Sequence, residues 1–231
     1  MRGRVVVVTG GTGALGQSIC LTFLAAGATV CAPYVVKEEE TALRGRVGSG
    51  DAARLEMAPC DVTDEAAVTA YVAQIVGRHR RLDVLVNAVG GFAGGDLVST
   101  PLAEWNRMMT LNLSTAVVAC RAVLPSMTSA GWGRIINVAS RVVVPPQGGF
   151  IAYTVSKAAV ITLTQALAQE VRPHGVTVNA VLPSTMDTPA NRRAMPDADR
   201  SGWVSTEAVA RAIAFLASEE ASAISGAALP V

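Results

Sequence analysis

A tyrosine and a lysine one helical turn apart carry the first chemical signal in this chain of 231 residues. Tyr153 and Lys157 stand at positions i and i+4 of the segment YTVSK, so on a helix both side chains project from the same face. An ammonium group beside a phenol favours the phenolate, and it would lower the pKa of the tyrosine from about 10 toward working pH. The pair therefore predicts a general acid/base, with Tyr153 as the residue that moves the proton.

A serine that precedes the tyrosine by thirteen residues adds a second polar group. Ser140 directly follows the apolar run at residues 134–139, and parallel sheets bind their ligands beyond the carboxyl ends of their strands. The Ser140 hydroxyl is therefore a candidate to hold a substrate oxygen beside Tyr153. Alone, a Tyr/Lys pair is most often a solvated helix face, but the serine and the spacing together favour a site.

A glycine-rich segment near the N-terminus predicts a phosphate-binding turn. The segment TGGTGALG at residues 9–16 follows an apolar run and leads into a helical stretch. Glycines permit a tight turn and a close approach of the backbone to a pyrophosphate at the positive end of the helix. A nucleotide triphosphatase is not expected, because Gln17 stands where its motif requires lysine. The residues that we expect to contact a dinucleotide here are Gly10, Thr12, Gly13, Ala14, Leu15 and Gly16.

Short apolar runs alternate with helical stretches and would position these groups. The runs lie at residues 5–8, 29–32, 82–86, 134–138 and 176–182, and a further edge strand is expected at 227–231. Continuous apolar strands are typical of a parallel sheet that helices cover on both faces. The sequence therefore predicts an α/β fold, a Rossmann-type doubly wound parallel sheet in a three-layer αβα sandwich. We expect a single domain over residues 1–231, with a substrate lid around residues 184–204.

Composition argues against several other classes of function. A net charge of +1 offers no basic field for nucleic acid or an anionic membrane. The two histidines are far apart in sequence and the four cysteines show no C-x-x-C spacing, so no metal site is expected. No stretch reaches about 18 uninterrupted apolar residues, as a membrane span requires. Scattered cysteines favour a reducing compartment, and we therefore expect a cytoplasmic protein.

With these residues identified, the chain resembles the short-chain dehydrogenase/reductase family over essentially its whole length. The catalytic Tyr-x-x-x-Lys of that family matches Tyr153 and Lys157, its serine matches Ser140, and its helix asparagine matches Asn112. The resemblance implies that the tyrosine exchanges a proton with the substrate oxygen while hydride passes to or from nicotinamide. It also implies that the serine orients that oxygen, the lysine binds the nicotinamide ribose and the asparagine holds a proton-relay water.

The resemblance implies further contacts and an assembly. Besides Tyr153 and Lys157, the cofactor contacts that it implies outside the glycine turn are Asp61, Val62, Asn87, Gly90, Pro183 and Thr188. The chain departs from the family pattern at Ala14 and Ser184, where glycine is usual, and at Ala88, where a second asparagine is usual. Members of the family commonly form homodimers or homotetramers through two long helices, which here would span residues 104–129 and 152–171.

Three functions are compatible with these residues. The leading interpretation is an NAD(P)-dependent oxidoreductase that interconverts a small-molecule ketone and a secondary alcohol. Residues 88–95 and 181–199 also look like the matching segments of dihydropteridine reductases, which makes such an enzyme the alternative. Ser140 and Asn112, which that group lacks, favour the ketone. A catalytically silent dinucleotide-binding scaffold is the third interpretation, and the intact set of four residues argues against it.

The choice between NAD and NADP depends on the residue that ends the second strand. Enzymes that prefer NAD place Asp or Glu there for the ribose hydroxyls, and this chain has Tyr34. Val35 follows, where many relatives that prefer NADP have arginine. Positive charge could come from Lys37, Arg44 and Arg46, but residues 38–40 are all glutamate. We therefore expect weak discrimination with a slight preference for NADP.

Overall fold

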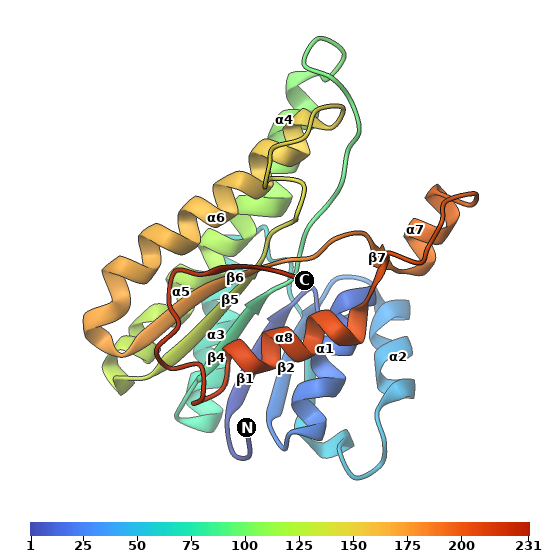
Figure 1. Ribbon diagram of the computed structural model, residues 1–231. Coiled ribbons are helices and arrows are strands. Elements are labelled where there is room, and N and C mark those ends of the chain that lie inside the picture. The colour runs from blue at the N-terminus through green and yellow to red at the C-terminus, as the bar shows by residue number, and fades with distance from the viewer.

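A seven-stranded sheet, parallel at every pairing, forms the centre of the computed structural model, which describes residues 1–231. The strand order is β3-β2-β1-β4-β5-β6-β9, so the direction in which the chain adds strands to the sheet reverses between β1 and β4 (Figure 1). Ligands of such sheets bind at this reversal, beyond the carboxyl ends of the strands. The strands are β1 Val5–Thr9, β2 Thr29–Tyr34, β3 Leu55–Pro59, β4 Val84–Asn87, β5 Gly133–Val138, β6 Val176–Leu182 and β9 Ala228–Pro230.

Helices cover both faces of the sheet, as the sequence predicts. Buried side chains of α1 and α8 form one hydrophobic core with Val6 and Val8 of β1, and those of α3, α5 and α6 form a second core with Val5 and Val7. Alternate residues of one strand thus enter opposite cores, which is why the run is apolar throughout. The helices are α1 Ala14–Ala25, α2 Lys37–Arg46, α3 Glu65–His79, α4 Leu102–Met109, α5 Thr115–Ala130, α6 Ile151–Val171, α7 Pro189–Ala194 and α8 Thr206–Leu216. The three-layer α/β prediction is confirmed.

The predicted strands are present, with two corrections. The strand expected at residues 82–86 runs from Val84 to Asn87 instead, and the carboxylate of the preceding Asp83 accepts a 2.8 Å hydrogen bond from the backbone of Val5. The strand β3 has no counterpart among the apolar runs of the sequence. This edge strand buries only Leu55 fully among its five residues, so it lacks the continuous apolar pattern of the central strands.

The two long helices lie side by side on one face of the sheet. The first runs from Leu102 to Ala130 through α4, a π-helical turn at Thr110–Ser114 and α5, and the second is α6 with the short helix Arg172–His174. By length and composition alone, both could cross a membrane. Their apolar residues contribute to the second core against β4, β5 and β6, which accounts for that composition.

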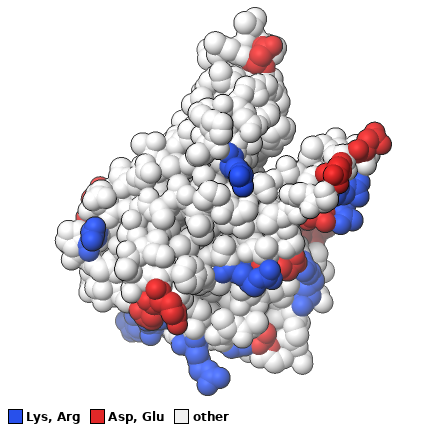
Figure 2. Space-filling view, viewed as in Figure 1, with Lys and Arg blue, Asp and Glu red and all other residues white.

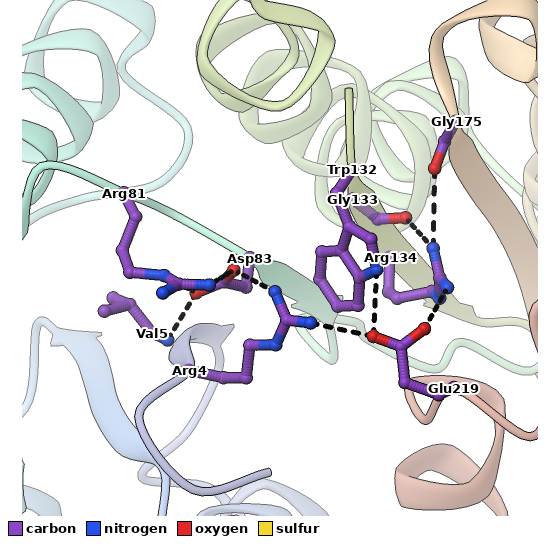
Figure 3. A network of polar contacts seen from close by, with 9 residues as sticks. All are labelled: Arg4, Val5, Arg81, Asp83, Trp132, Gly133, Arg134, Gly175 and Glu219. Carbon is purple, nitrogen blue, oxygen red and sulfur yellow. Dashed lines mark hydrogen bonds and ion pairs between the residues drawn. The ribbon is translucent and has the colours of Figure 1, made fainter. Parts of the chain in front are cut away.

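A polar network lies at the end of the sheet where the strands begin (Figure 3). Arg4 donates to Asp83 at 2.9 Å and to Glu219 at 2.7 Å, and so joins the start of β1 to the segment after α8. The Trp132 ring lies between two guanidinium groups, 3.7 Å from that of Arg4 and 4.3 Å from that of Arg134. The network holds the amino ends of the strands together and leaves the carboxyl ends free for ligands.

Residues 184–204 are more ordered than a simple loop. Met186–Asp187, labelled β7, pairs in parallel with β8 Val204–Ser205, and α7 lies between them. The segment expected as a substrate lid thus contains a two-strand pairing and a short helix. Figure 1 shows α7 and its connections projecting from the body of the molecule beside α2.

Candidate active site

Tyr153, Lys157 and Ser140 meet at the carboxyl end of β5. Ser140 lies two residues beyond the end of β5, while Tyr153 and Lys157 are in the first two turns of α6. The Ser140 hydroxyl lies close enough to the Tyr153 phenol to lower its pKa. Ser140 is 7% exposed and Lys157 is 5% exposed. The three residues that the sequence singled out thus form a polar group, with Ser140 and Lys157 buried and Tyr153 half-buried, at the edge where parallel sheets bind ligands.

The ammonium group of Lys157 is fixed by the sheet. Its Nζ atom donates a 2.8 Å hydrogen bond to the carbonyl oxygen of Val138, the last residue of β5. Burial lowers the pKa of Lys157 to about 8, because the charged form loses its hydration. Gly90 leaves room for this group, since a Cβ atom there would lie 3.1 Å from Nζ.

The expected effect of Lys157 on Tyr153 is not found. Burial raises the pKa of the Tyr153 phenol above its ordinary value, and the nearby Ser140 hydroxyl acts in the opposite direction with a smaller effect. The lysine does not lower it, because desolvation penalises both charges and the ammonium group is directed at Val138. The prediction of a phenolate favoured by Lys157 is wrong for this structure, in which the neutral phenol is favoured.

A local irregularity between α4 and α5 brings Asn112 to the site. Asn112 lies in the π-helical turn Thr110–Ser114 and is 2% exposed. Its amide exchanges two hydrogen bonds with the backbone of Gly91, accepting from N at 2.9 Å and donating to O at 3.1 Å. The amide nitrogen also donates to the hydroxyl of Ser156 at 2.9 Å. Single π-turns are common at functional sites, and this one turns Asn112 toward the loop after β4 and toward α6.

The glycine turn has the shape that a pyrophosphate requires. Gly10 has a φ of +68°, and a Cβ atom on Gly16 would come within 1.9 Å of the Gly10 carbonyl oxygen. Gly13 precedes the first residue of α1, and no side chain caps that helix. Its first N–H groups are therefore open to an anion at the positive helix end. These residues fit the phosphates of a dinucleotide, and the replacement of the usual glycine by Ala14 is accommodated as the first residue of α1.

Thr12 of the glycine turn has a partner that the sequence did not indicate. Its hydroxyl donates to the Glu39 carboxylate at 2.8 Å. Both residues line a cleft of about 470 Å³ between the glycine turn, α2 and the start of α7. Arg46, which also lines this cleft, donates to the side-chain oxygen of Gln17 at 2.8 Å.

The residues expected to supply positive charge for NADP are largely paired with other side chains. Lys37 lies 2.9 Å from the Glu40 carboxylate, and Arg44 pairs with the same group. Glu40 is 3% exposed, so it is not the solvated residue that a run of glutamates suggests. Tyr34 ends β2 and is half-buried, with the Lys37 ammonium group 5.4 Å from its ring centre.

The remaining predicted cofactor residues lie at strand ends, several with internal partners. Asp61 is exposed and accepts from the backbone and hydroxyl of Thr63 at 2.9 and 2.7 Å, while its neighbour Val62 is half-buried. Asn87 is buried and donates to Asn137 at 2.8 Å. Thr188 caps α7 by accepting from Asn191 at 3.2 Å, and Pro183 accepts from the backbone of Arg141 at 3.0 Å.

Sequence reasoning missed two aromatic residues beside Tyr153. The Phe92 ring lies edge-on to the Tyr153 ring, with 5.0 Å between centroids, and the Phe150 ring lies 5.8 Å from that of Phe92. The two phenylalanines are 58 positions apart and come from different loops, so no local spacing connects them. Phe150 directly precedes α6, and its place before the Tyr/Lys helix is the one signal that could have indicated it.

Potential metal ligands gather away from this site. The ligand atoms of Cys31, Glu56 and His79 lie within 4.8 Å of one another, a proximity that spacing along the chain does not reveal. Arg78 already pairs with Glu56 at 2.8 Å, and burial raises the pKa of Cys31 to about 12. The cluster is therefore explained as an ion-paired carboxylate beside a protonated thiol.

Comparison with known proteins identifies relatives over nearly the whole chain. The short chain dehydrogenase family model matches residues 4–199. The chain is 34% identical to 2-(R)-hydroxypropyl-CoM dehydrogenase of Xanthobacter autotrophicus, covering 98% of this chain and 96% of that protein. It is 31% identical to 3-oxoacyl-(acyl-carrier-protein) reductase FabG of Escherichia coli, covering 99% and 96%. The structure of ElxO with NADP bound superimposes with a TM-score of 0.92 at 28% identity, covering 100% and 97%.

The doubly wound sheet, the glycine turn and these matches define an NAD(P)-dependent oxidoreductase. The chain belongs to the short-chain dehydrogenase/reductase family. The dihydropteridine reductase alternative is not favoured by these matches, since the relatives named are a dehydrogenase and a ketoacyl reductase.

Proposed function

We propose that this enzyme interconverts a ketone and a secondary alcohol, with Tyr153 as the general acid/base. The observation that carries the proposal is the placement of the Ser140 hydroxyl beside the Tyr153 phenol at the carboxyl end of β5, where Lys157 is also held. It aligns two hydroxyl groups that could bind one substrate oxygen. Family membership fixes the type of cofactor but not the substrate, so the site must supply that argument.

Each polar group has a distinct role in this proposal. In ketone reduction, Tyr153 gives its phenolic proton to the developing alkoxide while Ser140 donates a hydrogen bond to the same oxygen. The raised pKa of Tyr153 keeps the phenol protonated at neutral pH and so ready to act as the acid. Lys157, held by Val138, would bind the nicotinamide ribose, and Asn112 would hold a proton-relay water, as the family resemblance implies.

The dinucleotide would bind along the carboxyl edge of the sheet. When bound, its nicotinamide supplies or accepts the hydride. The uncapped start of α1 and the residues Gly10, Gly13 and Gly16 would hold the pyrophosphate, while Asp61, Val62 and Asn87 would lie toward the adenine and nicotinamide portions. We further propose weak discrimination between the two dinucleotides with a slight preference for NADP, because Tyr34 neither binds the ribose hydroxyls as a carboxylate would nor repels a phosphate.

The surroundings of the site complete the proposal. Residues 184–204 would act as a substrate lid hinged at β7 and β8, and Arg192, paired with Asp187, would stabilise it. The long helices α5 and α6 would join copies into a homodimer or homotetramer. The residues 1–231 would act as one domain in the cytoplasm.

Replacing Tyr153 by phenylalanine tests the assignment. Tyr153→Phe keeps the aromatic ring but removes the proton donor, so kcat should fall by about 10²- to 10⁴-fold. Dinucleotide affinity, measured by titration calorimetry, should change little. A variant that kept the wild-type kcat on the best substrate of a ketone panel would overturn the proposal.

A further inference from the structure

Two phenylalanine rings and the Tyr153 ring form one aromatic group beside the candidate active site. The centroid distances are 5.0 Å between Phe92 and Tyr153, 5.8 Å between Phe92 and Phe150, and 6.4 Å between Phe150 and Tyr153. Both contacts to Tyr153 are edge-on, which is a favoured geometry for aromatic pairs. The chain has only four phenylalanines, so two of them at one site form a marked concentration.

Backbone hydrogen bonds hold the two phenylalanine loops in fixed positions. Gly95 donates to Gly149 at 2.8 Å and accepts from Ile151 at 3.1 Å, which joins the loop after β4 to the start of α6. On the other side of Phe92, the Asn112 side chain binds the backbone of Gly91. The rings are therefore presented by anchored segments, and their arrangement does not depend on a ligand to order it.

The aromatic group is incompletely covered. Phe92 is 62% exposed although its ring contacts Tyr153. The neighbouring loop tips add Leu97, Val98 and Val144, which are 63%, 97% and 58% exposed. Figure 2 shows that the lobe carrying α4 and these loops is nearly free of charged groups on the visible face. Exposed apolar surface concentrated beside a polar catalytic group is typical of a binding site for a partly apolar ligand.

We propose that Phe92 and Phe150 form a subsite for an aromatic ring attached to the substrate carbonyl, so that the enzyme prefers aryl ketones and aryl carbinols. The inference rests on the proposed ketone reduction. With its oxygen at Ser140 and Tyr153, a ketone would place the adjoining group against Phe92, where a flat ring extends the edge-on arrangement. An aliphatic ring of the same size gains the same burial but not the aromatic contact, which contributes about a 2- to 10-fold preference per pair.

Two ketones of equal size separate aromatic recognition from simple burial. The kcat/KM values for acetophenone and cyclohexyl methyl ketone would be compared with NADPH and NADH. The wild-type enzyme should favour acetophenone by at least about 2-fold, and Phe92→Leu should bring the ratio toward one. Phe215→Leu is the matched control, because Phe215 is 48% exposed on α8 and belongs to a different surface; this variant should keep the wild-type ratio.

The outcomes distinguish the inference from the proposed function. Equal efficiency with both ketones, or an unchanged ratio in Phe92→Leu, would overturn the aromatic subsite while leaving ketone reduction intact. If neither these ketones nor any other is turned over, the proposed function fails. In that case a binding experiment tests whether the aromatic subsite exists. NMR saturation transfer should show stronger contact of acetophenone than of the cyclohexyl ketone with the NADP-loaded protein. Equal transfer would overturn the inference.

Discussion

Asn112 is connected to the backbone of Tyr153 through a single hydroxyl group. Ser156 accepts a 2.9 Å hydrogen bond from the Asn112 amide and donates one of 2.8 Å to the Tyr153 carbonyl oxygen. Ser156 is fully buried, so water cannot replace either partner. The connection fixes the first turn of α6 against the π-helical turn and makes Ser156 a positioning residue for Tyr153.

Ser156→Ala should weaken both stability and catalysis. Loss of the hydroxyl leaves one buried N–H of the Asn112 amide without its oxygen partner, and the free energy of unfolding should fall by about 1–3 kcal/mol. Because Ser156 does not contact the substrate, kcat should fall with little change in KM. Thr162→Ala, an exposed position on the same helix, should change urea stability by less than about 0.5 kcal/mol. Equal stability losses in the two variants would contradict the positioning role.

Ser140→Ala should lower kcat and shift the pH profile. The Ser140 hydroxyl lowers the pKa of Tyr153 against the larger effect of burial, so its removal raises that pKa further. In alcohol oxidation, where Tyr153 must accept the proton, the rise of activity with pH should move to higher pH in the variant. The fall in kcat should be about 10²- to 10³-fold, as for loss of a donor to a developing oxyanion. Unchanged rates and an unchanged profile would exclude Ser140 from the reaction.

The central strands and the Tyr/Lys pair were predictable because their signals are local. The run Val5–Thr9 enters two cores at once, and its composition alone indicates burial on both faces. The spacing of Tyr153 and Lys157 likewise follows from helix geometry. The edge strand Leu55–Pro59 was not predicted because four of its five residues are not fully buried, so it lacks a continuous apolar pattern.

The details of the site depend on contacts between distant segments. The hydrogen bonds of Gly95 with Gly149 and Ile151 bring Phe92 to Phe150, and no sequence pattern encodes that approach. The sign of the pKa shift at Tyr153 could not be predicted either, because it depends on burial and on where the Lys157 ammonium group is directed. The spacing along the sequence was enough to identify Tyr153 and Lys157, whereas their pKa shifts depend on the three-dimensional arrangement.

Lys157 should make the stability of the ligand-free enzyme rise with pH between about 8 and 10. Burial lowers its pKa from the ordinary 10.5 to about 8 in the folded state, so in this window the unfolded chain binds a proton that the folded chain has released. Stability therefore increases with pH, by about 2 kcal/mol relative to Lys157→Met, which has no such proton. Urea unfolding of both proteins at pH 8, 9 and 10 measures the difference. Parallel curves would show that Lys157 is not desolvated.

Glu39 and Tyr34 should together control the choice of dinucleotide. The Glu39 carboxylate contacts Thr12 of the glycine turn and lines the adjoining cleft, where it would repel a 2′-phosphate. Lys37 and Arg44 are paired with Glu40, so they would attract that phosphate only weakly. The slight preference for NADP that we propose therefore depends on Tyr34, which puts no carboxylate at the ribose, and Glu39 limits it. Glu39→Gln should strengthen it by up to about 10-fold, since each 1.4 kcal/mol of lost repulsion corresponds to a factor of ten. Tyr34→Asp should reverse it by placing a carboxylate at the ribose.

The ratio of kcat/KM for NADPH and NADH checks both substitutions on one ketone. Glu38→Gln is the matched control, because Glu38 precedes Glu39 on α2 and lines the same cleft but does not take the Thr12 hydrogen bond. Its effect on the ratio should be smaller than that of Glu39→Gln, since its carboxylate is not held against the glycine turn. A strong wild-type preference for NADH would contradict the role given to Tyr34, and equal effects of the two glutamine variants would show that net charge, rather than the contact with Thr12, determines the choice.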